Sequence, residues 1–474
     1  MARKEQTAKQ RVERVRRLLK SPNAHIRALM SVLHPTEIAL VLEDSSAQLQ
    51  ERILKTLPKE VISEALAEMD EDTNPAQLLT LLKPEIASGL IKELAPDDAA
   101  DLLAQLPEEY KDKILYYVPD EDESILNQLL NYNEESAGGL MNPELVVVQE
   151  NMTKLEALRE VVGQSEEMDD FYTIYVVDTE NHLRGYLTFR SLFLARNTEL
   201  VMNFMSTDVV SVRVGTDQEE VAKKMSQYNL PTLPVVDLSD RLLGRITFDD
   251  IMDVIEEENT EDTLKFAGVS EDENLRGGWA NSVRSRIPWL LINLVTASIA
   301  MFVIKQFEST IEKIALIASL MPIIAGVAGN GATQTLAVTI RRISTDGIPS
   351  RKALRVVLKE ISVGAINGLM IGAIASVAVS IYNSQANPQL EVMIGVVVFM
   401  AMFGNLILAG MAGSFIPIML ERVGVDPAVA SSILITAFTD IIGYLLLFSL
   451  ASEILLPLVS TVGQGGLNLV PPVL

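Results

Sequence analysis

The sequence predicts a multi-domain protein in which a soluble α and α/β part precedes an all-α membrane part. Its 474 residues include 63 Asp and Glu but only 39 Lys and Arg, which gives a net charge of −24. Up to about residue 275 the chain reads as soluble and acid-rich, whereas from about residue 285 it is apolar with few charges. The negative charge argues against a nucleic-acid surface and is compatible with a protein that gathers cations.

Regularly spaced prolines predict an all-α superhelical N-terminal domain over residues 1–138. Pro84, Pro96, Pro107 and Pro119 lie 12, 11 and 12 residues apart, and acids and then an apolar stripe follow. Proline fits the first helical turn, and acids placed there meet the positive end of the helix dipole. Each unit is therefore expected to form one short helix that buries its apolar stripe by stacking on its neighbours.

Two matched halves follow the helical region. The stretch "IYVVDTENHLRGYLTFRSL" (174–192) matches "LPVVDLSDRLLGRITFDDI" (233–251), a period of about 59 residues. Each half predicts a strand, a turn, a strand and a helix, and together they resemble a tandem pair of CBS domains at 139–200 and 201–257. CBS pairs commonly sense adenosine nucleotides, so the resemblance implies one site, with ATP as the candidate, at Asp250, Asp253 and Arg190. Many CBS pairs serve only as scaffolds, and that alternative stays open.

An acidic connecting helix is predicted over 248–275, with eleven acids and Lys265 as its one base. Asp250, Asp253, Glu257 and Glu261 are spaced 3, 4 and 4 residues apart, so they share one helix face. Like charges at this spacing destabilise a helix by a few tenths of a kcal/mol per pair. The face is either solvated or a collector of cations next to the membrane, and the same two interpretations apply to Asp97 and Asp101 on one face of a short helix.

The membrane part, residues 285–474, contains five apolar segments long enough to span a bilayer, at about 285–305, 314–340, 361–382, 392–420 and 428–451. Basic residues precede the first segment and lie between the second and third, and no Lys or Arg follows Arg422. The positive-inside rule therefore predicts that the N-terminal domains are cytoplasmic and that the C-terminus lies outside. Gly364, Gly368 and Gly372 form a small-residue ladder typical of a close helix-packing face.

The fifth segment contains one carboxylate, Asp440, and no other Asp, Glu, Lys, Arg or His lies between Asp426 and Glu453. At 1.5 Å per residue Asp440 lies about 20 Å from either flanking charge, near the middle of the bilayer. Insertion scales put an Asp at that depth at about +2.5–3.5 kcal/mol. Without an intramembrane base as partner, the carboxylate is expected to be neutralised by a passing cation or a proton.

These features together resemble the MgtE family of magnesium channels over essentially the whole chain, most specifically in "GNGATQT", the following "IRRI", "GSFIPIMLERVGVDPA" (413–428) and the Asp440 segment. The resemblance implies a homodimer whose second and fifth spans line the pore, and a pore and selectivity set of Asp440, Asn330, Gln334, Ser432 and Thr436. It also implies that the connecting helix is a plug closed by regulatory Mg²⁺ on acids of the soluble part, which are Asp97, Asp101, Asp217, Glu219, Asp250, Glu258, Glu261 and Asp262.

The expected function is a Mg²⁺-selective channel that intracellular Mg²⁺ gates and that imports Mg²⁺ across the cell membrane. The chain departs from the usual family sequence at two places: Gly331 and Ala332 follow Asn330 where the family usually has any residue and then Gly, and Ser432 is the polar residue in "VASSI" where the family often has Ser-Gly/Asn-Pro. These departures leave the ion preference open. The first alternative is a secondary transporter coupled to H⁺ or Na⁺, with Mn²⁺, Co²⁺ or Zn²⁺ as cargo; the second is a membrane-anchored nucleotide sensor without a pore. With no Cys, three His and no P-loop or nucleophile motif, we expect neither a thiolate metal site nor an enzyme.

Overall fold

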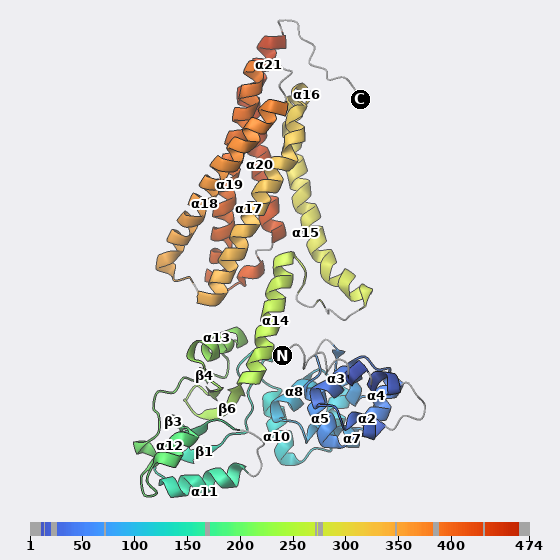
Figure 1. Cartoon of the computed structure of the whole chain (residues 1–474), viewed down its shortest axis with the longest axis vertical. Coiled ribbons are helices and arrows are strands. Elements are labelled where there is room, and N and C mark those ends of the chain that lie inside the picture. The colour runs from blue at the N-terminus through green and yellow to red at the C-terminus, as the bar shows by residue number, and fades with distance from the viewer. Residues whose placement is uncertain are drawn as a thin grey trace. The chain divides into compact units, whose positions relative to one another are not determined.

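The computed structural model describes residues 11–13, 15–19, 26–70, 73–165, 171–270, 273, 278–346, 348–382, 388–429 and 432–463. The chain forms two compact units, residues 1–258 and residues 259–474, and each is described by itself. Most elements of both units are labelled in Figure 1. The fold class expected from the sequence is confirmed: short helices, two small mixed sheets, a long acidic helix and five apolar helices.

Short helices, most of which begin at or just after a proline, build the start of the first unit. They are α2 (Ile26–Met30), α3 (Pro35–Glu43), α4 (Ala47–Leu54), α5 (Lys59–Ala67), α6 (Ala76–Leu79), α7 (Pro84–Ile91), α8 (Pro96–Ala104), α9 (Glu108–Leu115) and α10 (Asp120–Leu129). Proline is the first helical residue of α3, α7 and α8, and it is the N-cap residue of α5, α9 and α10. The predicted one-helix units are therefore present, because proline has no N–H to lose at a helix start.

The two matched halves form two small sheets of identical topology. β1 (Val147–Gln149) pairs in parallel with β2 (Ile174–Val177), which pairs antiparallel with β3 (Leu183–Leu187); β4 (Val212–Arg213), β5 (Thr232–Val236) and β6 (Leu242–Thr247) repeat this order. The register shifts at Val176/Val177 and again at Val235/Val236. A bulge at the same place in both halves supports the internal repeat that the sequence predicted.

Helices complete each half. In the first half α11 (Lys154–Ser165) lies between β1 and β2, and α12 (Phe189–Leu194) follows β3, with the short η2 turn (Val201–Asn203) after it. In the second half α13 (Gln218–Tyr228) lies between β4 and β5, and α14 (Phe248–Ala267) follows β6. The second half shares one hydrophobic core with the short helices, whereas the first half has a core of its own. This shared core holds α8 and the start of α14 in one unit.

The second unit consists of long apolar helices. They are α15 (Trp279–Gln306), α17 (Leu316–Asp346), α18 (Ser350–Tyr382), α19 (Pro388–Arg422) and α20 (Ser432–Leu450), with α16 (Glu308–Lys313), η3 (Pro427–Val429), the π turn η4 (Ala451–Leu455) and α21 (Leu456–Gly463) between or after them. By length and composition, five described helical stretches are candidate spans: 279–306, 316–345, 351–382, 388–422 and 432–459. The predicted number of spans is confirmed.

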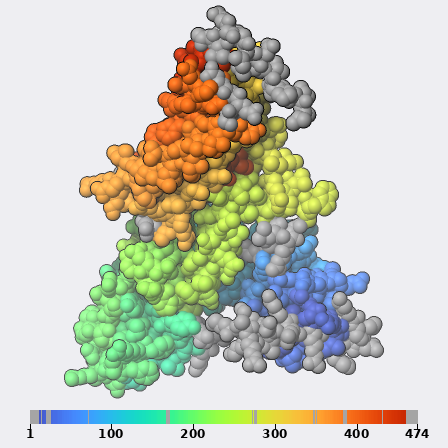
Figure 2. All heavy atoms as spheres, turned by 45° about the horizontal axis from the view of Figure 1, so that its top comes forward, coloured from blue at the N-terminus to red at the C-terminus, as the bar shows by residue number. Residues whose placement is uncertain are grey.

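The glycine ladder of α18 lies against α19, and these two helices run side by side in Figure 1; their atoms form one continuous orange surface in Figure 2. A Cβ at Gly368 would lie 3.0 Å from Cα of Phe403, and one at Gly372 would lie 3.3 Å from the carbonyl oxygen of Phe399. Such contacts with backbone atoms cannot relax by a side-chain rotation. The glycines therefore permit the close approach of two apolar helices, as small residues do in membranes.

Replacing Gly368 with leucine should push α18 away from α19 and destabilise the second unit by about 1–3 kcal/mol. The measurement is thermal unfolding of the full-length protein in detergent. Ile366→Leu, at an exposed position of the same helix, is the control and should leave the unfolding temperature unchanged. Equal unfolding temperatures for Gly368→Leu and the wild type would show that the close approach is not needed.

Candidate ion-binding sites

Asp440 lies on α20, on the side of this helix that meets α17. Gly329 of α17 packs on Thr436, one turn before Asp440: a Cβ at Gly329 would lie 3.0 Å from Cγ2 of Thr436. Asp440 is partly buried in the single chain, and no Lys, Arg or His among the described residues forms an ion pair with it. The carboxylate expected to lack a basic partner therefore lacks one in the described structure.

The other predicted pore residues lie on the same two helices. Ser432 and Thr436 are partly buried on α20, and Asn330 and Gln334 are exposed on α17. Asn330 and Gln334 are one turn apart, and Ile323, Gly326 and Val338 continue their exposed face along the helix. Within the described part of the chain, no side-chain hydrogen bond joins any two of the five predicted residues. The structure thus places the five residues on two helices that contact each other.

Asn405 of α19 is a buried polar residue within the fourth candidate span. It is 0% exposed, and its Nδ2 lies 3.5 Å from the carbonyl oxygen of Ile324 in α17. A Cβ on Gly443 of α20 would lie 2.5 Å from the same Nδ2. Asn405 therefore packs where α17, α19 and α20 meet, which agrees with a role as interhelical hydrogen-bonding residue.

In the first unit, acids of α8 and of the start of α14 lie close enough to affect one another. Burial, reinforced by Asp98 and Asp250, raises the pKa of Asp97 well above its usual value. Burial and then Asp250, Asp249, Glu68 and Asp253 raise the pKa of Asp98 to about 6. Burial also raises the pKa of Asp250, against the hydrogen bonds from Thr247. The arrangement therefore favours either protonation or a nearby cation.

Asp97 is positioned by a hydrogen bond. It is 8% exposed, and Nδ2 of Asn142 donates to its Oδ1 at 3.1 Å. Asn142 is in turn bridged to β6: its N–H donates to the carbonyl of Arg245 at 2.8 Å, and its carbonyl accepts from the N–H of Arg245 at 2.9 Å. Asp101 lies one turn further along α8 and is partly buried. The sequence singled out Asp97 but missed Asp98 and Asn142.

Three further predicted acids meet at the start of α13. Asp217 is the N-cap residue and accepts from the N–H of Glu219 at 3.0 Å, and both side chains are exposed. Gln218, between them, donates through Nε2 to Oε1 of Glu258 on α14 at 2.8 Å. The structure therefore brings Asp217, Glu219 and Glu258 to one region through a residue that the sequence did not single out.

The remaining two predicted acids belong to the second unit. Glu261 forms an ion pair with Lys265, one turn later on α14. Burial, and then the negative charge of Asp426, raises the pKa of Asp262, while Lys265 and Arg341 lower it. Within the described residues, no three His, Asp or Glu side chains gather closely enough to hold a metal ion. In the described residues, several of the acids influence one another through their charges.

The predicted nucleotide residues are divided between the halves. Asp250 caps α14, since its Oδ2 accepts from the N–H of Thr247 at 3.2 Å and from the Thr247 hydroxyl. In the first half, Thr188 and Ser191 form the equivalent capping box on α12. Asp253 on α14 and Arg190 on α12 are exposed. Thr247 with Asp250, and Thr188 with Ser191, thus have a structural role at the starts of α14 and α12.

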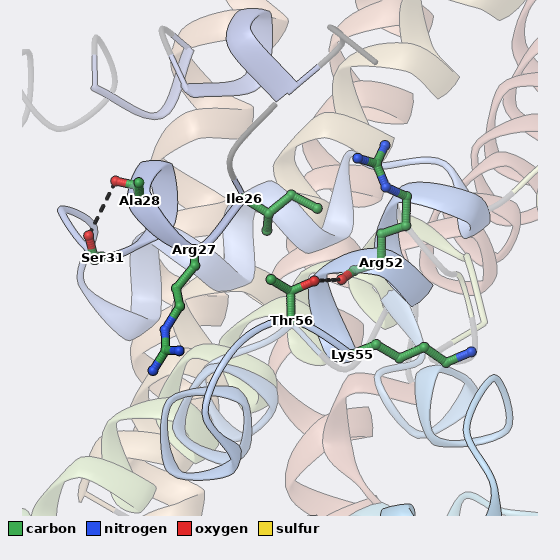
Figure 3. Close-up of a pocket in the computed structure, with 7 residues that line it drawn as sticks. All are labelled: Ile26, Arg27, Ala28, Ser31, Arg52, Lys55 and Thr56. Atoms are coloured by element: carbon green, nitrogen blue, oxygen red, sulfur yellow. Dashed lines mark hydrogen bonds between the residues drawn. The ribbon is translucent and has the colours of Figure 1, made fainter. Parts of the chain in front are cut away.

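A described pocket lies elsewhere in the first unit, between α2 and α4. Its lining includes Arg27, Arg52 and Lys55. Figure 3 shows that these three charged ends point in different directions rather than toward a common point, and Lys55 is paired with Glu51. The pocket contains none of the predicted site residues.

The fold and these sites define a multi-pass membrane protein with an acid-rich soluble unit. Residues 321–450 match the family model described as divalent cation transporter, residues 33–135 match the MgtE intracellular N domain, and 137–197 and 201–257 match CBS domains. The magnesium transporter MgtE of Thermus thermophilus is 33% identical over 91% of this chain and 95% of its own length, and that of Bacillus subtilis is 30% identical over 90% and 93%.

The chain belongs to the MgtE family of magnesium transporters, which are not enzymes. Its N-terminal part matches the family's intracellular domain. The soluble part of a magnesium transporter is 30% identical in sequence, with a TM-score of 0.48 over 53% of this chain and 99% of that chain. The cytosolic domain of the Mg²⁺ channel MgtE in complex with ATP is 35% identical, with a TM-score of 0.46 over 48% and 93%.

The pKa of Asp98, about 6, predicts a pH dependence of stability. Because its folded pKa lies above the unfolded value of about 3.9, its contribution is fully present below about pH 4 and is lost as pH rises through about 6. Asp98→Asn removes this loss, so at pH 7 without divalent cations the variant should be more stable than the wild type by about 1–3 kcal/mol.

Thermal unfolding of the full-length protein between pH 4 and 8 measures this effect. Asp112→Asn, at an exposed position on α9, is the matched control and should follow the wild-type pH profile. Parallel profiles for Asp98→Asn and the wild type would contradict the raised pKa.

Proposed function

We propose that this chain is a Mg²⁺-selective channel that assembles as a homodimer, imports Mg²⁺ across the cell membrane and closes when intracellular Mg²⁺ is high. The observation that carries the proposal is the carboxylate of Asp440, partly buried on an apolar helix without a basic partner. An Asp near the bilayer centre costs about 2.5–3.5 kcal/mol on insertion scales. A permeating cation is the charge that offsets this cost.

The chemistry of the neighbouring residues favours Mg²⁺. Mg²⁺ dehydrates reluctantly and is usually held by one or two carboxylates while it keeps several waters. Two copies of Asp440 across a two-fold axis supply two carboxylates, and Asn330, Gln334, Ser432 and Thr436 supply groups that hydrogen-bond the ion's water shell. Oxygen and amide groups alone, without thiolates, suit this hard cation better than Zn²⁺.

The exposed face of α17 supports a homodimer. Asn330 and Gln334 are exposed in the single chain although they lie within a candidate span. Amide side chains facing lipid are unfavourable because hydrocarbon offers them no hydrogen bonds. A second copy that places this face around a hydrated pore removes the penalty for both residues.

Gating follows from the charges of α8, α13 and α14. Burial, and then neighbouring carboxylates that include Asp250, raise the pKa of Asp97 and of Asp98, so without cations these carboxylates repel Asp250. Mg²⁺ that binds among the regulatory acids offsets this repulsion and favours the closed state. The regulatory set is Asp97, Asp101, Asp217, Glu219, Asp250, Glu258, Glu261 and Asp262.

The remaining assignments follow from the sequence. Arg341, Arg342 and the bases at the start of α18 lie between the second and third spans, so the N-terminal domains are cytoplasmic and the C-terminus lies outside. Domain boundaries at 1–138, 139–200, 201–257, 248–275 and 285–474 remain part of the proposal. ATP, bound to the cytosolic domain of one relative, is a candidate modulator of the CBS pair through Asp250, Asp253 and Arg190.

Ion-specific flux into proteoliposomes with varied internal Mg²⁺ tests the whole proposal. A channel gives downhill Mg²⁺ flux that needs no H⁺ or Na⁺ gradient and falls as internal Mg²⁺ rises. Uphill movement of the ion driven by an H⁺ or Na⁺ gradient would instead establish a coupled transporter. The same assay with Mn²⁺, Co²⁺ and Zn²⁺ in place of Mg²⁺ identifies which ion is transported.

Asp440→Asn should lower Mg²⁺ flux by at least about a hundredfold, because even changes to outer-shell partners of metal ligands cost roughly 10–100-fold. The asparagine keeps the volume of the side chain, so yield and size-exclusion profile should match those of the wild type. Glu453→Gln, which neutralises an exposed acid beyond α20, should retain flux. Wild-type flux in Asp440→Asn would remove Asp440 from the mechanism.

The absence of cysteine makes the dimer axis testable by cross-linking. Gln334→Cys should give a covalent dimer with a short bifunctional thiol reagent in membranes, because the residue faces its own copy across the pore. Ile366→Cys, on the exposed face of α18, is the control and should remain monomeric on denaturing gels. Equal cross-linking at both positions would contradict the proposed axis.

A further inference from the structure

The end of α14 is fixed in geometry within the second unit. The N–H of Val269 donates to the carbonyl of Leu264 at 2.9 Å and the N–H of Gly268 donates to that of Lys265 at 3.0 Å, which is the Schellman ending of a helix. Gly268 has φ +72°, a conformation that favours glycine. A Cβ on Gly268 would overlap the side chain of Ile433, so α14 ends directly against the first turn of α20.

Two neighbouring side chains strengthen this junction. Phe266 packs against the hydrophobic core of the apolar helices. The ammonium of Lys265 donates to Oδ2 of Asp426, in the segment between α19 and α20, at 2.9 Å, and it also pairs with Glu261. The Lys265 side chain is 14% exposed and that of Asp426 is 38% exposed, so the lysine end of this bridge is largely withdrawn from solvent.

Asp426 links the bridge to the start of α20. Its second oxygen, Oδ1, accepts from the N–H of Ala428 at 2.8 Å and so fixes the η3 turn. The η3 turn leads into α20, where Ile433, Thr436 and Asp440 follow at successive turns. One carboxylate therefore joins the end of α14 to the turn that positions the Asp440 helix.

Lys265 is the one base among the eleven acids of the connecting segment 248–275. Asp262 and Asp426 repel each other, and Lys265 and Arg341 oppose that repulsion, as the causes of the raised pKa of Asp262 show. Without the lysine charge, Asp262 and Asp426 would repel each other more strongly, and Glu261 would lose its ion pair with Lys265. The lysine is a permanent cation at a place where the chain otherwise gathers negative charge.

We propose that Lys265 is a positioning residue that clips the end of α14 to the α19–α20 segment through Asp426, so that α20 and its Asp440 move together with the connecting helix. The functional consequence rests on the channel function proposed above, in which α14 closes the pore. A covalently held ammonium sets the resting position of the helix whether or not divalent cations are bound. Mg²⁺ then acts on a helix whose end is already attached to the α19–α20 segment.

The structural part of the proposal is tested without any transport measurement. Since the chain has no cysteine, Thr263→Cys and Val425→Cys, both exposed, can carry two spin labels in the full-length protein diluted with unlabelled copies. The distance distribution should broaden toward longer values in Lys265→Met without Mg²⁺. It should remain narrow in Lys265→Arg, and it should narrow again in the charge-reversed pair Lys265→Asp with Asp426→Lys. A distribution in Lys265→Met identical to the wild type overturns the clip.

The functional part is tested by flux against internal Mg²⁺. Lys265→Met should raise the half-inhibitory Mg²⁺ concentration about fivefold, the factor that a coupling of about 1 kcal/mol gives, and the charge-reversed pair should restore it. Lys313→Met, which removes an exposed base on α16, should leave it unchanged. An unchanged half-inhibitory concentration in Lys265→Met overturns the coupling. If flux proves to be gradient-coupled, the channel proposal fails while the label distances still decide the clip.

Discussion

Uncompensated negative charge is the constraint on which this structure depends. Acids outnumber bases by 63 to 39, and the fold brings several acids together or into apolar surroundings instead of spreading them over the surface. Asp97 and Asp98 are held near Asp250, and Asp440 lies within an apolar helix. Each arrangement costs free energy unless a cation or proton is present. A protein whose stability depends on the ion that it transports can respond directly to the concentration of that ion.

Small residues let this charge be placed inside a packed helical bundle. Glycines bring α17 against Thr436, α18 against α19, and α20 against Asn405, all at distances that a Cβ would prevent. Close approach maximises dispersion contacts among helices that gain nothing from the hydrophobic effect in lipid. It also leaves the amides of Asn330 and Gln334 on a continuous exposed face. The packing of one face of α17 against its neighbours thus determines which polar side chains are exposed on its opposite face.

Local signals were sufficient to predict the fold class. Prolines predicted the short helices, the 59-residue repeat predicted two equal sheets, and apolar length predicted five spans. The site was less predictable because its members depend on long-range packing. Asp98 follows Asp97 in sequence, yet only the packing of α8 on α14 shows that its carboxylate faces Asp249 and Asp250. Nothing local marked Asn142 or Asp426 as partners of distant residues, and the regulatory set remains a prediction from family resemblance.

A lysine ammonium and a bound Mg²⁺ can have different roles near the end of α14, because one is permanent and the other exchanges with solution. A lysine ammonium has fixed stoichiometry and one charge, so it sets a geometry but reports nothing about the cell. A bound Mg²⁺ brings two charges and can join two carboxylates, but only at a concentration that fills the site. In the channel proposed above, these two roles would be separate: the Lys265 ammonium holds one end of α14 near Asp426, and Mg²⁺ bound along the acidic face would set how the remaining carboxylates are arranged. A connecting helix anchored at one end needs less binding free energy to close than a free one, because part of its ordering entropy is already lost.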